Sequence, residues 1–198
     1  MHLRLSTLLL FVTTLLGASI ALAQADEKQG ESGSVSPRFA AMSTEAAFVC
    51  GEFLPNQIEG ITELMPLCGA RAGFKMGKKT FMEGQLVGGS ARAQRYILGS
   101  FSFRGDLQVD DIVGSFYGGP DIHYATSPTY GTSGANGEQT KMYFGVHIGG
   151  AVWWEFTDNL FLRTDLQFNL NPGTSLFVGF SLVLRFGAGG GDGGGPGQ

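Results

Sequence analysis

Charged residues are scarce in this chain of 198 residues. Asp, Glu, Lys and Arg make up 15% of it, whereas soluble domains carry about 25%. Because 43% of the residues are hydrophobic, much of the folded surface is expected to face something other than water. Basic residues are not in excess either, since 13 Lys and Arg stand against 17 Asp and Glu. The basic stripe needed to bind phosphates is missing, so no nucleic-acid partner is predicted.

Long hydrophobic runs are absent after the N-terminus. The first run, Leu5 to Ile20, follows Arg4 and ends in Ala21-Leu22-Ala23, which predicts a signal peptide over residues 1–23. The run is nearly long enough to be an uncleaved anchor, but the small-residue site and the polar segment after it favour cleavage. No later stretch reaches the ~18 apolar residues of a transmembrane helix. If the mature chain spans a membrane, it must be a β-barrel, because only helices and closed barrels satisfy every backbone group in lipid.

Cysteine and histidine are rare as well. The two cysteines, Cys50 and Cys68, both follow the signal peptide, and an even pair in an exported chain predicts one disulfide. A metal site would need histidines or carboxylates near this pair, but the glutamates there are scattered and no histidine lies among them. The Gly-rich stretch 187–195 lacks the Lys and Ser/Thr of a phosphate loop. No metal or cofactor is therefore predicted.

Alternation of apolar and polar residues is the strongest positive signal. From Leu160 to Leu170, Leu and Phe fall on one face, and Arg, Asp, Gln and Asn fall on the other. After the turn Asn171-Pro172-Gly173 the pattern resumes from Thr174 to Phe186, and it is also present from Met142 to Phe156. These segments exceed the five or six residues usual in globular sheets and match the ~9 to 11 residues of a membrane-spanning strand.

The same rule predicts five more strands upstream. They cover Arg38–Val49, Cys68–Met76, Thr80–Gly88, Arg95–Arg104 and Ile112–Tyr124. Ala, Met and Glu in the first of these segments would suit a helix equally well. An even strand number with both ends in the periplasm is the arrangement of bacterial outer-membrane barrels. The prediction is an all-β, eight-stranded antiparallel up-and-down transmembrane β-barrel over residues 38–186, with a flexible segment 24–37 before it.

The lengths of the connections between these strands provide a test of the predicted number of strands. Cys50–Leu67, Gly89–Gln94 and Ala125–Lys141 are predicted as long outer loops, and the disulfide would pin the first of them at the outer strand ends. Gly105–Asp111 is long for a periplasmic turn, and the Asn171 turn is short for an outer loop.

Charged residues support the assignment of faces. An Arg or Lys on the lipid side of a barrel costs ~2 to 4 kcal/mol at mid-membrane, and ten charges fall on the face opposite the apolar one. These predicted lumen charges are Glu45, Arg71, Lys75, Glu83, Arg104, Asp121, Glu155, Arg163, Asp165 and Arg185. Because both signs are present and eight strands leave room only for side chains, we expect a salt-bridged, closed lumen rather than a diffusion pore.

The C-terminal half also carries a family resemblance. The Gly-x-His-x-Gly-Gly strand after Phe144, the Phe-Thr-Asp-Asn turn and the Leu-Arg-Thr-Asp-Leu strand resemble the outer-membrane β-barrel domain superfamily, the small OmpA/OmpX-like barrels. The last strand resembles the insertion signal by which such proteins are recognised, and its apolar positions are Phe180, Leu182, Leu184 and Phe186. This resemblance implies the barrel-insertion machinery as a partner. The family usually ends near that Phe, whereas a Gly-rich tail 187–198, expected to be flexible, follows here.

Aromatic residues and candidate catalytic residues lie near the strand ends. Trp154 and Phe156, close to the inner strand ends, are predicted to form part of an interfacial girdle, with core packing as the alternative. Asp121, His123 and Ser127 could share the outer rim, where some small outer-membrane barrels are lipid A acyltransferases or deacylases. Three common residues at this spacing are more often structural, so no catalytic residue is assigned.

We therefore expect a monomeric bacterial outer-membrane barrel with a structural or surface-interaction role. Its partners would be outer-membrane lipid and an unidentified extracellular molecule bound by the outer loops. Besides a lipid-modifying enzyme, a soluble exported lipocalin-like carrier of apolar ligands is an alternative, which would need the charged face outside and the apolar face inside.

Overall fold

The structure is a computed structural model that describes residues 42–77, 79–109, 112–128, 139–171 and 173–187. The predicted signal peptide, the segment 24–37 and the tail from residue 188 onward lie outside the described residues. Within the described residues, no helix is long and apolar enough to cross a membrane.

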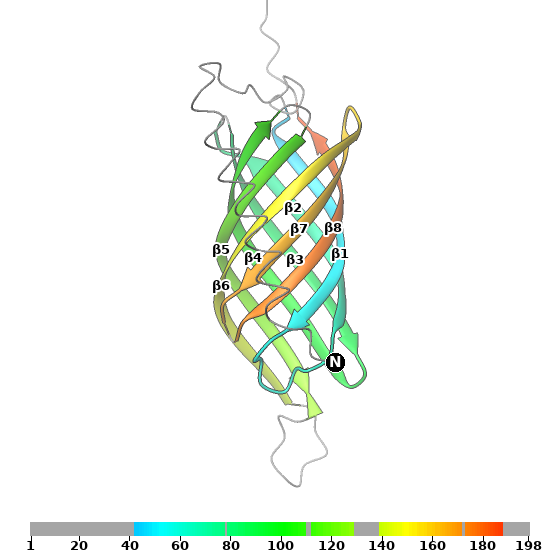
Figure 1. Ribbon diagram of the computed structural model, residues 1–198, viewed down its shortest axis with the longest axis vertical. Helices are drawn as coiled ribbons and strands as arrows, with labels where there is room; N and C mark the ends of the chain where they lie inside the picture. Colours follow the sequence, from blue (N-terminus) through cyan, green and yellow to red (C-terminus); the bar gives the residue numbers. More distant parts are fainter. Residues whose placement is uncertain (1–41, 78, 110–111, 129–138, 172, 188–198) are drawn as a thin grey trace, which may run out of the picture. The chain divides into compact units, whose positions relative to one another are not determined.

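Eight strands form one closed antiparallel barrel, in which each strand pairs with its neighbours in sequence and β1 pairs with β8 (Figure 1). The strands are β1 Thr44–Pro55, β2 Met65–Lys75, β3 Thr80–Ala91, β4 Gln94–Val109, β5 Ile112–Ser127, β6 Gln139–Thr157, β7 Leu160–Asn169 and β8 Ser175–Phe186. The predicted fold class and strand number are confirmed. The first segment, for which a helix was the alternative, is a strand from Thr44 onward.

Several predicted strand limits are wrong, and most of the larger errors leave the predicted strand too short. β1 starts at Thr44 rather than Arg38, but it continues past Val49 to Pro55. Only residues 92 and 93 separate β3 from β4, so the predicted outer loop Gly89–Gln94 is a tight hairpin. At its C-terminal end, β4 continues to Val109. The connection between β4 and β5, predicted as Gly105–Asp111 and long for a periplasmic turn, is therefore short.

The apolar face of the strands points outward. Phe48, Phe144 and Phe180 are each more than half exposed, whereas Arg104, Arg163 and Asp165 are at most 1% exposed inside the barrel. A water-soluble carrier would need the reverse arrangement, because exposed apolar surface on this scale is unfavourable in water. The faces are those of a barrel with lipid outside.

Cys50 and Cys68 form a disulfide. The two residues are direct register partners on β1 and β2, with Cα atoms 4.1 Å apart. Three further residue pairs, ending with Phe53 opposite Met65, lie between the disulfide and the loop. The disulfide is therefore inside the β1–β2 ladder and not at the outer strand ends, where the sequence pattern predicted it.

Candidate functional site

The barrel interior is the candidate site, and it is divided into levels along the axis. Charged residues, together with a small apolar cluster of Met42, Val113, Trp153, Phe161 and Val183, fill the end where β1 begins and β8 ends. Apolar residues fill the opposite end, where β1 leads into β2. Two histidines lie between them, on β5 and β6. The uniformly charged lumen predicted from the sequence is thus correct for only one half of the barrel.

Four arginines and four carboxylates form the charged level among the described residues. They are Arg71, Arg104, Arg163, Arg185, Glu45, Glu83, Asp106 and Asp165. Arg104 is central to this charge layer, because its guanidinium contacts Glu45, Glu83 and Asp106 from three strands. Equal numbers of each sign meet the requirement that buried charges be paired.

A second set of contacts ties the charge layer across the lumen. Glu83 also pairs with Arg163 at 2.6 Å, and Arg163 pairs with Asp165 at 2.7 Å. Asp165 in turn accepts from Arg71 Nη1 at 3.0 Å. Charges from β2, β3 and β7 are therefore linked through the centre of the barrel, and the links occupy space that an aqueous channel would need.

Aromatic rings support the arginines of the charge layer. The Trp153 ring lies 4.8 Å from the Arg104 guanidinium carbon and 4.9 Å from that of Arg163, within the range of cation–π attraction. Its indole Nε1 donates to Ser115 Oγ at 2.7 Å. The contact of Trp153 with several guanidinium groups was not predicted from the sequence.

The predicted lumen charges do not all lie in the charge layer. Lys75 is half-buried on β2, while Asp121 lies at the middle level. Glu155 is exposed at the end of β6, beside a register shift, so it lies at the rim of the barrel and not in the charge layer. Asp106 was missed because the predicted strand stopped at Arg104. The alternation continues past that point, since apolar Phe103 and Leu107 alternate with charged Arg104 and Asp106.

Two histidines share Asp121 at the middle level. His123 Nε2 lies 2.9 Å from Asp121 Oδ1, and His147 Nδ1 lies 3.6 Å from Asp121 Oδ2. The outer nitrogens of the two rings contact Tyr96 at 2.5 Å and Ser102 at 2.8 Å. All of these side chains are buried, so they form one connected row of polar side chains inside the barrel.

The glycines around His147 make this packing sterically feasible. A Cβ at Gly149 would lie 2.4 Å from the Tyr117 ring, and one at Gly145 would lie 2.4 Å from Asp121 Oδ1. The Gly-x-His-x-Gly pattern of β6 therefore makes room for side chains that β5 sends into the lumen.

The geometry gives no support to the alternative of a catalytic set of Asp121, His123 and Ser127 at the outer rim. Tyr96 and Asp121 already occupy both ring nitrogens of His123, which leaves neither for Ser127. Ser102, His147 and Asp121 have the residue types of a hydrolytic triad, but they are at most 9% exposed and packed between the charged and apolar levels. Among the described residues, no cluster of His, Cys, Asp and Glu could hold a metal ion.

Apolar side chains fill the outer level of the lumen. This apolar plug consists of Val49, Phe53, Ile58, Ile61, Met65, Leu67, Val87, Tyr96, Leu98, Ala125 and Phe177. Ile58 and Ile61 belong to the β1–β2 loop, residues 56–64, and are 4% and 2% exposed. This loop therefore folds inward over the barrel mouth, and we call it the lid loop.

Polar contacts attach the lid loop to three neighbouring hairpins or strands. Asn56 donates to Thr174, with Nδ2 to Oγ1 at 2.7 Å. Gln94 Oε1 accepts from the backbone of Thr62 at 3.1 Å, and Lys141 pairs with Glu59 at 2.8 Å. The loop thus covers the mouth through contacts around its rim.

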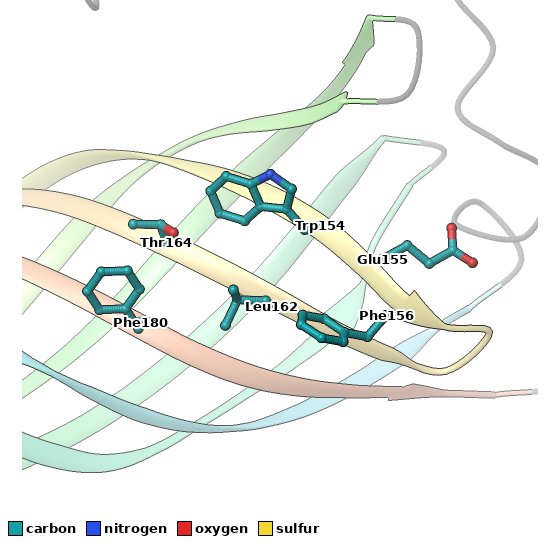
Figure 2. A pocket seen from close by; sticks show the side chains of 6 residues that line it. All are labelled: Trp154, Glu155, Phe156, Leu162, Thr164 and Phe180. Atoms are coloured by element: carbon teal, nitrogen blue, oxygen red, sulfur yellow. The ribbon is translucent and has the colours of Figure 1, made fainter.

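The remaining predicted site residues lie on the outer surface. Phe180, Leu182, Leu184 and Phe186 are each at least half exposed along β8. Trp154 and Phe156 are exposed on β6 close to the turn into β7, and Figure 2 shows them on the same outer face as Leu162 and Phe180.

Comparisons with known proteins identify the fold. No protein family and no curated protein matches the sequence. Among solved structures, the chain is similar to the N-terminal β-barrel domain of Pseudomonas aeruginosa OprF, with 12% identity over 73% of this chain and 98% of that one, at a TM-score of 0.56. It is also similar to Neisserial surface protein A, with 10% identity over 74% and 97% of the two chains, at a TM-score of 0.57.

A third similar structure is Ail, the attachment invasion locus protein of Yersinia pestis. It shares 6% identity over 72% of this chain and 95% of that one, at a TM-score of 0.52. All three are small eight-stranded outer-membrane barrels. The predicted resemblance to such barrels is confirmed at the level of the fold.

Proposed function

We propose that this chain is a bacterial outer-membrane protein with a closed lumen that acts at the cell surface through its outer loops. The main support is the filled interior: the lid loop and the apolar plug occupy the mouth, and the charge layer occupies the other half. A barrel filled in this way offers no water-lined path for general diffusion. The outward apolar face and the fold shared with known outer-membrane barrels support the location.

Interaction at the surface is proposed because of the loops at the lid end of the barrel. Connections at the lid end are the lid loop, the hairpin residues 92–93, the segment from 128 to 138 and the short turn after β7, and loops on a rigid scaffold usually carry recognition. Neisserial surface protein A is named for the surface, and Ail is named the attachment invasion locus protein. Both names are consistent with such a role. The partner of this chain is an unidentified extracellular molecule, and the barrel itself is proposed to be a monomer inserted by the barrel-insertion machinery.

Cell fractionation and lysine labelling test location and orientation together. The chain should be recovered in the outer membrane with a gel mobility that changes on boiling. A membrane-impermeant amine reagent applied to intact cells should label Lys141, which contacts the lid loop, but not Lys79, in the turn between β2 and β3 at the opposite end. Recovery in the soluble periplasm, or labelling of Lys79 alone, would contradict the proposal.

Conductance in planar bilayers tests the closed lumen. The purified barrel should give no stable open channel, because two separate levels block the axis. Replacing Ile58 and Ile61 by Asn should loosen the lid loop yet still give no channel, since the charge layer remains below it. Steady single-channel currents from the unmodified protein would exclude a closed lumen.

A further inference from the structure

At the lid end of the barrel, β6 begins farther out than the strand that follows it. β6 pairs with β5 from Gln139 onward, whereas its pairing with β7 starts only at His147, opposite Asn169. In Figure 1 the start of β6 and the end of β5 extend beyond the turn between β7 and β8. The first residues of β6 therefore have a strand partner on one edge only.

Hydrogen bonds where β7 ends show which backbone groups of β6 point away from β5. The amide of Leu170 donates to the carbonyl of Val146 at 3.0 Å. Two residues earlier on β6, the carbonyl of Phe144 accepts from the side-chain amide of Asn171. Because residues of an antiparallel strand direct their backbone groups to its two edges alternately, the even-numbered residues of β6 face the β7 side.

Thr140 and Met142 continue this series beyond the carbonyl that Asn171 satisfies. Both residues are exposed, Met142 at 56%, and no residue that the structure describes bonds to their backbone groups on this side. Across the hairpin, the Thr140 and Thr126 hydroxyls lie 3.0 Å apart, which ties β6 to β5. The N–H and C=O groups of Thr140 and Met142 form an open strand edge, the β6 edge, and such an edge is a template for an added strand.

We propose that the β6 edge binds an extended polypeptide segment of an extracellular partner as an added strand. Main-chain hydrogen bonds to Thr140 and Met142 would supply the attraction, and alternate side chains of the segment would lie on the outer face of the barrel. An apolar or β-branched side chain suits the position beside Met142. The proposal gives a partner class to the proposed surface role, and it rests on that role because the lid end must face out of the cell.

A second copy of the chain in the same membrane does not fit the β6 edge. Strands of outer-membrane barrels tilt by about 35 to 45°, so two upright barrels related by a twofold axis along the membrane normal would bring their β6 strands together at about twice that tilt. Strands that cross so steeply cannot form a ladder, since neighbouring strands in a sheet differ in direction by only about 20 to 25°. A segment that is free of the membrane has no such restriction.

Backbone amide exchange, followed by NMR on the purified barrel in lipid nanodiscs, provides the test. The probe is the synthetic peptide acetyl-Lys-Thr-Val-Thr-Val-Thr-Lys-amide, and the control is the same peptide with every internal amide N-methylated. At a peptide concentration about nine times its dissociation constant, exchange at Thr140 and Met142 should slow about tenfold. The amides of Lys141 and Tyr143 point toward β5, so their exchange should not change.

A proline substitution separates the backbone donor from the side chain. Met142→Pro removes one N–H from the β6 edge and spares the β5–β6 ladder, because proline is tolerated where a strand's N–H faces an open edge. It should weaken peptide binding, read from the slowing at Thr140, by about tenfold, the loss expected for one hydrogen bond. Met142→Ala keeps the N–H and should bind the peptide nearly as the unmodified chain does.

The outcomes separate this proposal from the proposed function. Slow exchange at Thr140 and Met142 in the free barrel would overturn it, since the edge would then be covered by the chain itself or by a second copy. An absence of slowing with the peptide, equal slowing with the N-methylated peptide, or unchanged affinity in Met142→Pro would overturn it as well. Binding to the purified barrel does not depend on orientation in the cell, so labelling of Lys79 alone on intact cells would contradict only the proposed function.

Discussion

At the scale of single residues, the charge layer is where stability is most sensitive to substitution. Arg104 contacts Glu45, Glu83 and Asp106 and is 1% exposed. Removing one partner of a buried ion pair typically costs about 3 to 5 kcal/mol, because the remaining charges are left uncompensated. Arg104→Ala should lower the free energy of unfolding by about this amount, measured by denaturant titration of the barrel in lipid vesicles.

Arg92→Ala is the matched control for that substitution. Arg92 pairs with Glu63 at 2.6 Å, but its side chain is 81% exposed, and exposed pairs contribute about 0 to 1 kcal/mol. The two arginines lie at opposite ends of β4, in the hairpin before it and near its far end. Equal losses from the two variants would mean that the charge layer adds no stability beyond an ordinary surface pair.

Residue-level prediction from the sequence worked where alternation is regular and failed where it breaks. The parity of Arg163 and Asp165 places them inside, as the structure has them. Glu155 obeys the same parity but lies beside the register shift at the end of its strand. The sharing of Asp121 by His123 and His147 depends on the β5–β6 register, which alternation within a single strand does not contain.

At the scale of elements, the strands that were cut short show a physical limit of the method. Alternation marks a strand only while one face is polar. Val49, Phe53 and Leu67 point into the apolar plug, so the inner face is no longer polar there and the alternation of apolar outward and polar inward residues is lost. The predicted strand ends therefore marked the boundary of the apolar plug rather than the end of backbone pairing.

The disulfide between β1 and β2 leads to a prediction at this scale. Cys50 and Cys68 are 18 residues apart, and cross-linking a loop of about 15 residues stabilises a fold by about 3 kcal/mol in the chain-entropy description. The Cys50→Ser, Cys68→Ser double variant should therefore unfold at lower denaturant concentration. The barrel of this double variant should still close, because β1 also pairs with β8 and β2 also pairs with β3.

Unboiled gel mobility provides the measurement for the double variant, with unfolding followed by tryptophan fluorescence. Reduced unmodified protein should behave like the double variant, which separates loss of the cross-link from the effect of serine itself. Failure of the double variant to form a heat-modifiable barrel would show that the disulfide is required to assemble the β1–β2 ladder.

At the scale of the whole molecule, the barrel closes through the pairing of its first strand with its last. β8 completes the barrel by pairing with β1 from Thr44 opposite Phe186 to Pro55 opposite Ser175. The sequence predicts closure because strands in lipid must satisfy every backbone group, and the structure confirms it. The division of the lumen into charged and apolar halves depends on which strands' residues meet at each level, so it required the register of all eight strands.

The last strand also offers a test of how the whole barrel reaches the membrane. Phe186 ends the predicted insertion signal and is 51% exposed on the outer face, so it contributes little to internal packing. If the barrel-insertion machinery reads this residue, Phe186→Ala should reduce the amount of heat-modifiable barrel in cells, while purified protein should refold in detergent as the unmodified chain does. Phe144→Ala on β6 is the control, since Phe144 is 66% exposed on the same outward face. An equal loss in cells from both variants would indicate a general need for outward apolar surface, and failure of Phe186→Ala to refold in detergent would indicate a structural role.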